Sequence, residues 1–315
     1  SRRWSAAMLS ATDPDRDLAA LLPPLVSANA SFPVAPAVAA ALDLPAGVRV
    51  CAGGGDNMMA AIGTGNVAPG VLTMSLGTSG TLFTCADRPV IDDRAGWAAF
   101  CSSTGAWLPL ICTMNCTVAT DNVARAFGFE SRDGDALLLG TRPGADGLGM
   151  LPFFNGERTP DLPRARASFH GLDFENFTRA NAYRAAMEGA TYALFNGFES
   201  LRTAGLEFTS IRLTGGGSRS AAWRQMVADV FELPVDVPAE QEGAAFGAAL
   251  QALWACTTPG TQAELEALAR EHVQLAEGLG ARPDPAAGAA YRRSYERFQH
   301  QLRIEIDRPN PYQSI

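Results

Sequence analysis

Short apolar runs alternate with helical segments and glycine-rich turns along most of the chain. Two β-rich runs, at 71–76 and 81–85, flank a four-residue loop bounded by glycines, which is the pattern of a hairpin. Further strands are expected at 97–101, 106–112, 148–154, 211–214 and 235–237. Helices are expected at 113–127, 178–204, 218–231 and 243–254, with a loop at 131–147. This alternation predicts an α/β fold in which helices flank a parallel or mixed sheet.

Before the hairpin, residues 48–52 predict a short, largely buried strand that runs into three glycines, 53–55. Asp56 follows them and opens an apolar helix that reaches about Ile62. A carboxylate at the positive end of a helix, on backbone that a ligand can approach, could take a proton from a substrate hydroxyl. Asn57 could donate to and accept from a sugar hydroxyl. The alternative is that Asp56 is only a helix N-cap; the triple glycine favours the ligand-binding interpretation.

The hairpin loop is a candidate phosphate site, because it offers backbone N–H groups and two hydroxyls in the manner of an anion nest. A purely geometric role in the tight turn is the alternative. The loop consists of Gly77, Thr78, Ser79 and Gly80.

A second glycine-rich turn follows the strand at 211–214 and precedes a helix. Gly215 and Gly217 have the spacing of a dinucleotide fingerprint, and Asp236 follows about 20 residues on, but Ser220 replaces the third glycine. The segment therefore allows three interpretations: a dinucleotide turn, glycine backbone on which an adenosine rests, or a structural βα turn.

Composition excludes several kinds of chemistry. All 25 basic residues are arginine, which removes the P-loop lysine, Schiff-base chemistry and a lysine general base. The net charge of −8 would repel nucleic acid and anionic lipid, so neither is an expected partner. The six cysteines form no disulfide framework, and no apolar run reaches the roughly 20 residues that span a bilayer. A cytoplasmic protein is expected.

No protein metal site is expected, because the three histidines share no ligand spacing with each other or with cysteine. Cys112 and Cys116, one helical turn apart, suit core packing better than a metal. Glu157 and Arg158 could bind a polar ligand, although an exposed ion pair in a loop is the commoner explanation.

In order, these pieces resemble the C-terminal part of the FGGY carbohydrate kinases, and the xylulokinase branch most closely. A further stretch, 171–188, is similar to the second family signature and departs from it at Ala182. The five ordered motifs that carry the resemblance lie at 52–57, 75–80, 155–160, 213–229 and 242–249.

The resemblance implies two actin-like, ribonuclease-H-like domains with a cleft between them. Residues 1–68 would be the end of the sugar-binding domain, and 69–315 the nucleotide-binding domain. Asp56 would be the catalytic base that deprotonates the sugar, and Asn57 would help to hold the sugar. The hairpin loop would be the second phosphate loop. Gly215, Gly216, Gly217 and Ser220 would form the adenosine pocket.

The implied activity is the ATP- and Mg²⁺-dependent phosphorylation of a small ketose, D-xylulose, to its 5-phosphate. Kinases of glycerol, gluconate or ribulose, a non-catalytic nucleotide-binding module of actin-like fold, and an NAD-dependent dehydrogenase are the alternatives. The family's N-terminal phosphate hairpin does not occur in this sequence. The chain is therefore expected to be a portion of a kinase that alone turns over poorly, and the resemblance leaves room for a homodimer.

Overall fold

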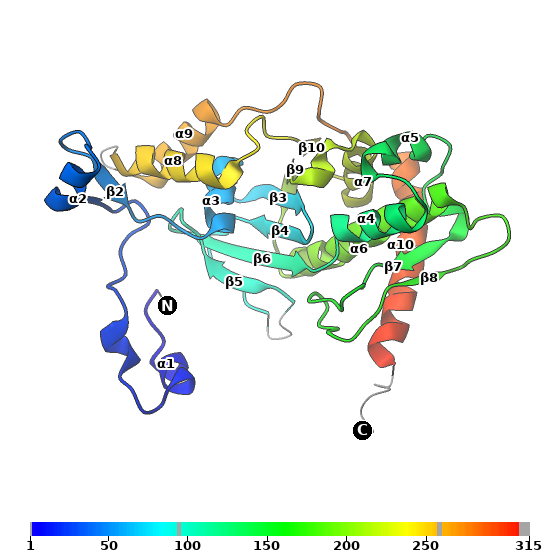
Figure 1. The fold of residues 1–315 in the computed structure, drawn as a ribbon, viewed down its shortest axis with the longest axis horizontal. Helices are drawn as coiled ribbons and strands as arrows, with labels where there is room; N and C mark the ends of the chain where they lie inside the picture. The colour runs from blue at the N-terminus through cyan, green and yellow to red at the C-terminus, as the bar shows by residue number, and fades with distance from the viewer. Residues whose placement is uncertain (1, 93–95, 257–259, 309–315) are drawn as a thin grey trace.

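The computed structural model describes residues 2–92, 96–256 and 260–308. Within them, a six-stranded sheet has the order β10-β9-β3-β4-β6-β5 (Figure 1). β9 is parallel to both β3 and β10, whereas β4 is antiparallel to β3 and β6. The expected mixed sheet is therefore confirmed. Its strands are β3 (Gly70–Leu76), β4 (Gly80–Thr84), β5 (Ala98–Cys101), β6 (Trp107–Thr113), β9 (Phe208–Thr214) and β10 (Val235–Asp236).

Helices cover both faces of the sheet. Because side chains alternate along a strand, Leu72 and Met74 of β3 face one way, into the large core formed with α6 (Arg179–Thr203), α7 (Ala221–Phe231) and α10 (Pro285–Asp307). Phe83 and Leu110 face the other way and form a cluster with α3 (Asp56–Gly63). The other helices that follow β3 in the described chain are α4 (Thr117–Ala126), α5 (Gly134–Leu138), α8 (Gly243–Cys256) and α9 (Gln262–His272). No helix of the described residues is both long and apolar enough to cross a membrane.

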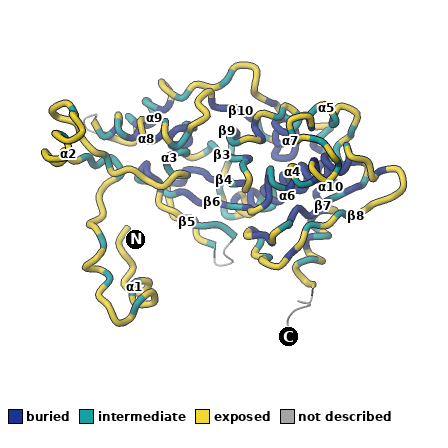
Figure 2. Tube along the Cα trace, viewed as in Figure 1, coloured by how far each residue is buried: buried dark blue, intermediate teal, exposed yellow. Residues whose placement is uncertain are grey.

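The N-terminal segment, residues 2–51, lies outside this core. It contains α1 (Ala6–Thr12), α2 (Pro36–Ala41), β1 (Ser31–Pro33) and β2 (Arg49–Cys51), and Figure 2 shows it almost entirely exposed. The expectation that 48–52 is largely buried is wrong: Val50 is 56% exposed. β2 pairs only with β1 among the described residues, and α8 contacts both strands of this two-stranded sheet.

Some expected elements differ in extent. The strand expected at 148–154 is only β7 (Gly149–Leu151), which pairs with β8 (Ser168–His170). The loop expected at 131–147 contains α5. The helix expected from residue 218 begins at Ala221, because a 3-10 turn, Gly216–Arg219, precedes it. Cys112 and Cys116 do not share a helix: the former lies in β6, and the latter is buried at the start of α4.

Candidate active site

The two glycine turns lie side by side at one edge of the sheet. β3 and β9 run parallel with Ser75 opposite Thr214, so the turns that follow them leave the sheet at the same edge. Gly215 has φ +81° and lies so close to Leu76 that a Cβ atom would come within 2.7 Å of the Leu76 carbonyl carbon. A glycine is required here by both conformation and packing. Leu76 directly precedes the hairpin loop, so the candidate phosphate and adenosine sites are neighbours.

The hairpin loop keeps its donors free. The carbonyls of Gly77 and Thr78 accept hydrogen bonds from the amides of Thr117 (2.9 Å) and Cys116 (3.1 Å), and the Gly77 amide donates to the Ser79 carbonyl (3.1 Å). Thr78 and Ser79 are exposed, and no partner for their amides or hydroxyls is found among the described residues. Two N–H and two O–H donors therefore face solvent, as an anion site requires.

In the second glycine turn, nothing in the conformation or packing of the protein requires a glycine at position 216. Gly217 is buried against Leu76 and Trp223, but a Cβ atom at Gly216 would meet nothing within 4 Å. Gly216 also lacks a positive φ, so neither conformation nor packing requires glycine there. Open backbone of this kind suits the close approach of a flat ligand.

The Ser220 hydroxyl is already hydrogen-bonded to other groups of the protein. It accepts a hydrogen bond from the Trp223 amide (3.0 Å) as the N-cap of α7 and donates to the carboxylate of Asp135. Asp135 also accepts from the Ala221 amide (2.8 Å). A carboxylate thus already neutralises the start of α7, where an anion could otherwise bind. The sequence offered no signal for Asp135, and contact of Ser220 with nucleotide stays a prediction.

Asp56 is exposed in the first turn of α3, and the alternative that it is the N-cap is wrong, because Gly55 holds that position. Asn57 donates to the Asp56 carboxylate from its backbone N–H (2.8 Å) and from its side-chain Nδ2 (3.3 Å). The carboxylate makes no ion pair with any described residue.

Two of the three glycines before Asp56 have reasons within the protein itself, one of conformation and one of packing. Gly53 has φ +70°, and Gly54 lies against the Ser103 side chain. The side chain of Gln251, from α8, donates to the carbonyls of Gly53 (3.3 Å) and Ala28 (3.0 Å). The triple glycine is therefore no evidence for a ligand by itself. The structure brings the two glycine turns together at Leu76 and holds the Asp56 elbow separately, against the turn after β5.

The expectation of an exposed Glu157–Arg158 ion pair is wrong. Glu157 is only 1% exposed, and its carboxylate accepts three hydrogen bonds instead of pairing with an arginine. The sequence did not indicate that Glu157 is buried, because an isolated glutamate in a polar loop is normally exposed to solvent.

Asp236, the acidic residue of the dinucleotide-like pattern, is engaged in the protein. It forms ion pairs with Arg212 (2.6 Å) and Arg282 (3.1 Å). A carboxylate held by two guanidinium groups is poorly placed to accept from a ribose hydroxyl. This arrangement disfavours the dehydrogenase alternative. No cluster of three metal-ligating side chains occurs in the described parts of the chain.

Comparison with known proteins identifies relatives of this chain. Residues 72–256 match the FGGY family of carbohydrate kinases, C-terminal domain. The chain is 42% identical over 298 residues to a xylulose kinase of Haemophilus influenzae, covering 94% of this chain and 60% of that protein. It is 32% identical over 312 residues to a xylulose kinase of Escherichia coli K12, covering 96% and 62%. The chain thus spans about 60% of the length of the curated relatives it matches.

Solved structures agree with this result. A xylulose kinase from Brucella ovis superposes with a TM-score of 0.86 at 32% identity, covering 96% of this chain and 61% of that one. A Plasmodium falciparum glycerol kinase with ADP superposes with a TM-score of 0.80 at 17% identity, covering 95% and 59%, and so shows the fold alone. The fold is actin-like and ribonuclease-H-like, as expected. From its matched domain and its relatives, the chain belongs to the FGGY family of carbohydrate kinases.

Proposed function

We propose that the paired glycine turns bind ATP, with the phosphates on the hairpin loop and the adenosine on the backbone of Gly216. The observation that carries this proposal is the contact of Gly215 with Leu76. Because of this contact, the unpaired donors of Thr78 and Ser79 lie beside the open backbone of the second glycine turn. Backbone N–H groups held in advance cost no reorganisation when a phosphate binds.

Replacement of Gly216 tests the nucleotide site. Gly216→Val would put a branched side chain where no protein atom lies, so ADP affinity should fall at least tenfold while the unfolding temperature stays unchanged. Gly140→Val is the matched control, because Gly140 is also exposed, without positive φ and without neighbours within 4 Å. Calorimetric titration of MgADP measures the affinity. Equal affinity in wild type and Gly216→Val would reject this adenosine site.

For the whole enzyme we propose ATP-dependent phosphorylation of D-xylulose to D-xylulose 5-phosphate. The names of the relatives from Haemophilus influenzae and Brucella ovis support the substrate. Asp56 takes the proton of the sugar hydroxyl, the freed oxygen attacks the γ-phosphorus, and the bond from that phosphorus to ADP breaks. Asn57 orients the carboxylate through its two hydrogen bonds and holds the sugar. The solvent exposure of Asp56 and its lack of an ion pair in the described chain support this role.

Mg²⁺ fits the donors that are present. The ion usually keeps several waters and binds through nucleotide phosphates with one or two carboxylates, so a dedicated protein cage is unnecessary. The described residues contain no such cage, and Asp56 is an exposed carboxylate of the kind that Mg²⁺ accepts. When bound, the ion neutralises charge on the transferred phosphoryl group.

We also propose the division into 1–68, the end of the sugar-binding domain, and 69–315, the nucleotide-binding domain. Two observations support it: the family match begins at residue 72, and α1, β1, α2 and β2 contribute no buried residue, whereas α3 packs against α8 across the proposed boundary. A cytoplasmic location and a homodimer stay predictions.

The activity is tested with Asp56→Asn in the complete protein. Turnover of D-xylulose, followed as sugar-dependent ADP release, should fall at least a thousandfold, whereas ADP affinity should not change. A panel with glycerol, gluconate and ribulose tests the sugar. Rapid turnover of another polyol without xylulose-dependent release would reject the substrate, and full activity of the variant would reject Asp56 as the base.

A further inference from the structure

Glu157 is a buried carboxylate whose hydrogen bonds all go to nearby backbone and amide groups. Oε1 accepts from the amides of Met114 (2.6 Å) and Arg158 (2.7 Å), and Oε2 accepts from the side chain of Asn115 (3.1 Å). An ionised carboxylate is costly to bury unless such donors satisfy it. Glu157 therefore holds the segment that follows β6 in one conformation.

Asn115 makes the arrangement rigid. Its side-chain nitrogen also donates to the Gly156 carbonyl (2.7 Å), and its oxygen accepts from the Phe154 amide (3.2 Å). The Thr159 hydroxyl donates to the Cys112 carbonyl (3.0 Å). We name this set of contacts the 115–157 clamp: Asn115, Glu157 and Thr159, which join the loop 154–159 to the end of β6.

The clamp leads directly to the hairpin loop. Cys116 and Thr117, the next residues after Asn115, donate their amides to the carbonyls of Thr78 and Gly77. These bonds turn both carbonyls away from solvent and leave the amides of Thr78 and Ser79 without partners in the described chain. The orientation of the loop donors thus depends on where residues 114–117 lie.

We propose that Glu157 is a positioning residue for the phosphate loop: through residues 114–117 it holds the carbonyls of Gly77 and Thr78 so that the loop amides face the β- and γ-phosphates of a nucleotide. The inference rests on the proposed nucleotide site and assigns to Glu157 no contact with the ligand. Because the clamp reaches the loop and not the Gly216 turn, it should affect phosphate binding without affecting adenosine binding.

Glu157→Gln is a sharp test, since the two side chains have nearly the same size. The glutamine oxygen can replace Oε1, but its NH₂ group then faces the NH₂ group of Asn115, two donors in contact. Asn115 cannot turn over without losing its bonds to Gly156 and Phe154. We expect at least tenfold weaker binding of MgADP by the full chain, unchanged binding of adenosine in ligand-observed NMR, and faster hydrogen exchange in a peptide covering 113–118.

Glu188→Gln is the control, because Glu188 is an equally buried glutamate (2% exposed) on α6 that takes no part in the clamp. It should leave both exchange at 113–118 and ADP affinity unchanged. If Glu157→Gln does not fold, Thr159→Val replaces it: this near-isosteric change removes one bond of the clamp and should raise the exchange less.

The outcomes separate the two proposals. Unchanged exchange at 113–118 in the folded variants would overturn the positioning role, and so would an equal loss of adenosine and ADP binding. If wild type binds no MgADP, the proposed function fails, while exchange still decides whether the clamp holds the loop.

Discussion

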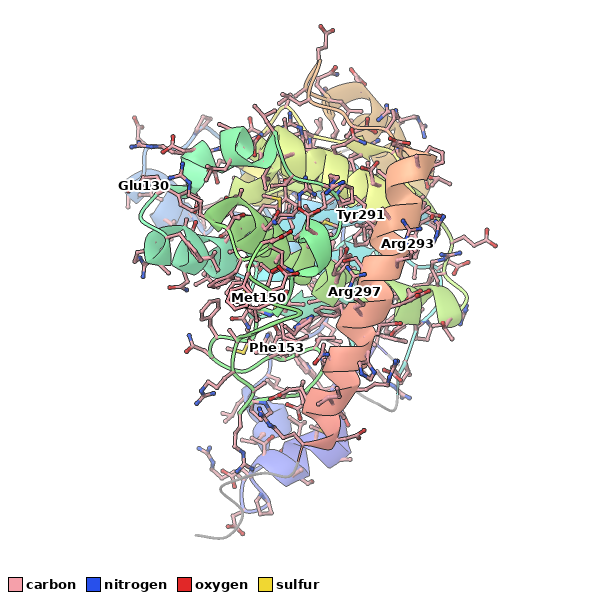
Figure 3. All side chains as sticks on the ribbon, turned by 90° about the vertical axis from the view of Figure 1, so that its right-hand side faces the viewer. Glu130, Met150, Phe153, Tyr291, Arg293 and Arg297 are labelled. Atoms are coloured by element: carbon pink, nitrogen blue, oxygen red, sulfur yellow. The ribbon has the colours of Figure 1, made fainter. Side chains whose placement is uncertain are left out.

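At the scale of single residues, Glu188 is the clearest case of a charge governed by its surroundings. It accepts a hydrogen bond from the Gly144 amide (2.8 Å) and lies 3.4 Å from Arg184, which in turn donates to Tyr291 (2.9 Å). Figure 3 labels Tyr291 and Arg297 on α10, and Arg297 lines a small cavity together with Glu188. Burial raises the pKa of Glu188 to about 7, and the charge of Arg184 only partly opposes that shift.

This pKa predicts a pH dependence of stability. The folded state holds the Glu188 proton more tightly than the unfolded chain does. The stabilisation of the folded state that results is complete below pH 4.5 and is lost as the pH rises through about 7. Urea unfolding should show that the free energy of unfolding falls more between pH 5 and pH 8 in wild type than in Glu188→Gln, by a few kcal/mol at most. Glu175→Gln, at an exposed position, is the control. The same pH dependence in all three proteins would contradict the prediction.

At the scale of elements, α3 depends on close contact with α8. Gly247 of α8 lies against the backbone of α3, where a Cβ atom would come within 2.8 Å of the Gly63 nitrogen. Gly63 lies equally close to the first turn of α8. Two helices approach this closely only where side chains are missing, and α3 carries Asp56 at its start.

We therefore expect Gly247→Ala to destabilise the chain by about 1–3 kcal/mol or more, since the added methyl group must separate the two helices. Gly243→Ala is the matched control on the same helix: its Cβ atom would find its nearest atom, a methyl of Thr64, at 3.7 Å. Denaturant midpoints measure both. Equal midpoints for the two variants would show that the helices tolerate the extra atom.

The start of α7 supplies a second test at this scale. Ser220 caps the helix and is itself held by Asp135 of α5. Ser220→Ala should cost about 1 kcal/mol in unfolding free energy, because it removes the cap and leaves Asp135 with fewer donors. If ADP affinity is unaffected by this change, Ser220 is a cap alone; a tenfold loss of affinity beyond the change in stability would support its predicted contact with nucleotide.

At the scale of the whole molecule, the N-terminal segment and the sheet core differ in how firmly they are held. Large apolar side chains of the segment are exposed, among them Met8 (65%), Leu21 (69%) and Val50 (56%). Figure 1 shows α1 extending away from the sheet. In the proposed whole enzyme, these side chains would pack against the rest of the sugar-binding domain.

Limited trypsin digestion should therefore cut first within residues 2–51. Arg16, with 67% of its side chain exposed, is the expected site, whereas Arg224 in α7 is only 8% exposed and should resist. Mass spectrometry identifies the first fragments, and thermal unfolding of the cut chain should match that of the intact chain. Early cleavage within residues 70–92 or 96–256 would contradict this division.

Much of the fold and part of the site follow from local patterns. Alternating and periodic apolar residues predicted the hairpin of β3 and β4 and the long helix α6, because each pattern is complete within one stretch of sequence. The glycine turns were predicted for the same reason. The exposure of β2 and the burial of Glu157 could not be predicted, since both depend on which segments cover them.

The sequence by itself determined the two glycine turns, the family to which they belong, and the order of most strands and helices from β3 to α8; it did not indicate α5, β8, α9 or α10. Only the tertiary structure decided that Gly215 lies against Leu76, that Asp135 rather than a ligand meets the start of α7, and that Glu157 faces inward. The physical reason is distance along the chain. β3 pairs with β9 more than 130 residues away, and the register of such a pair is selected by the packing of the whole sheet and its helices rather than by either strand alone.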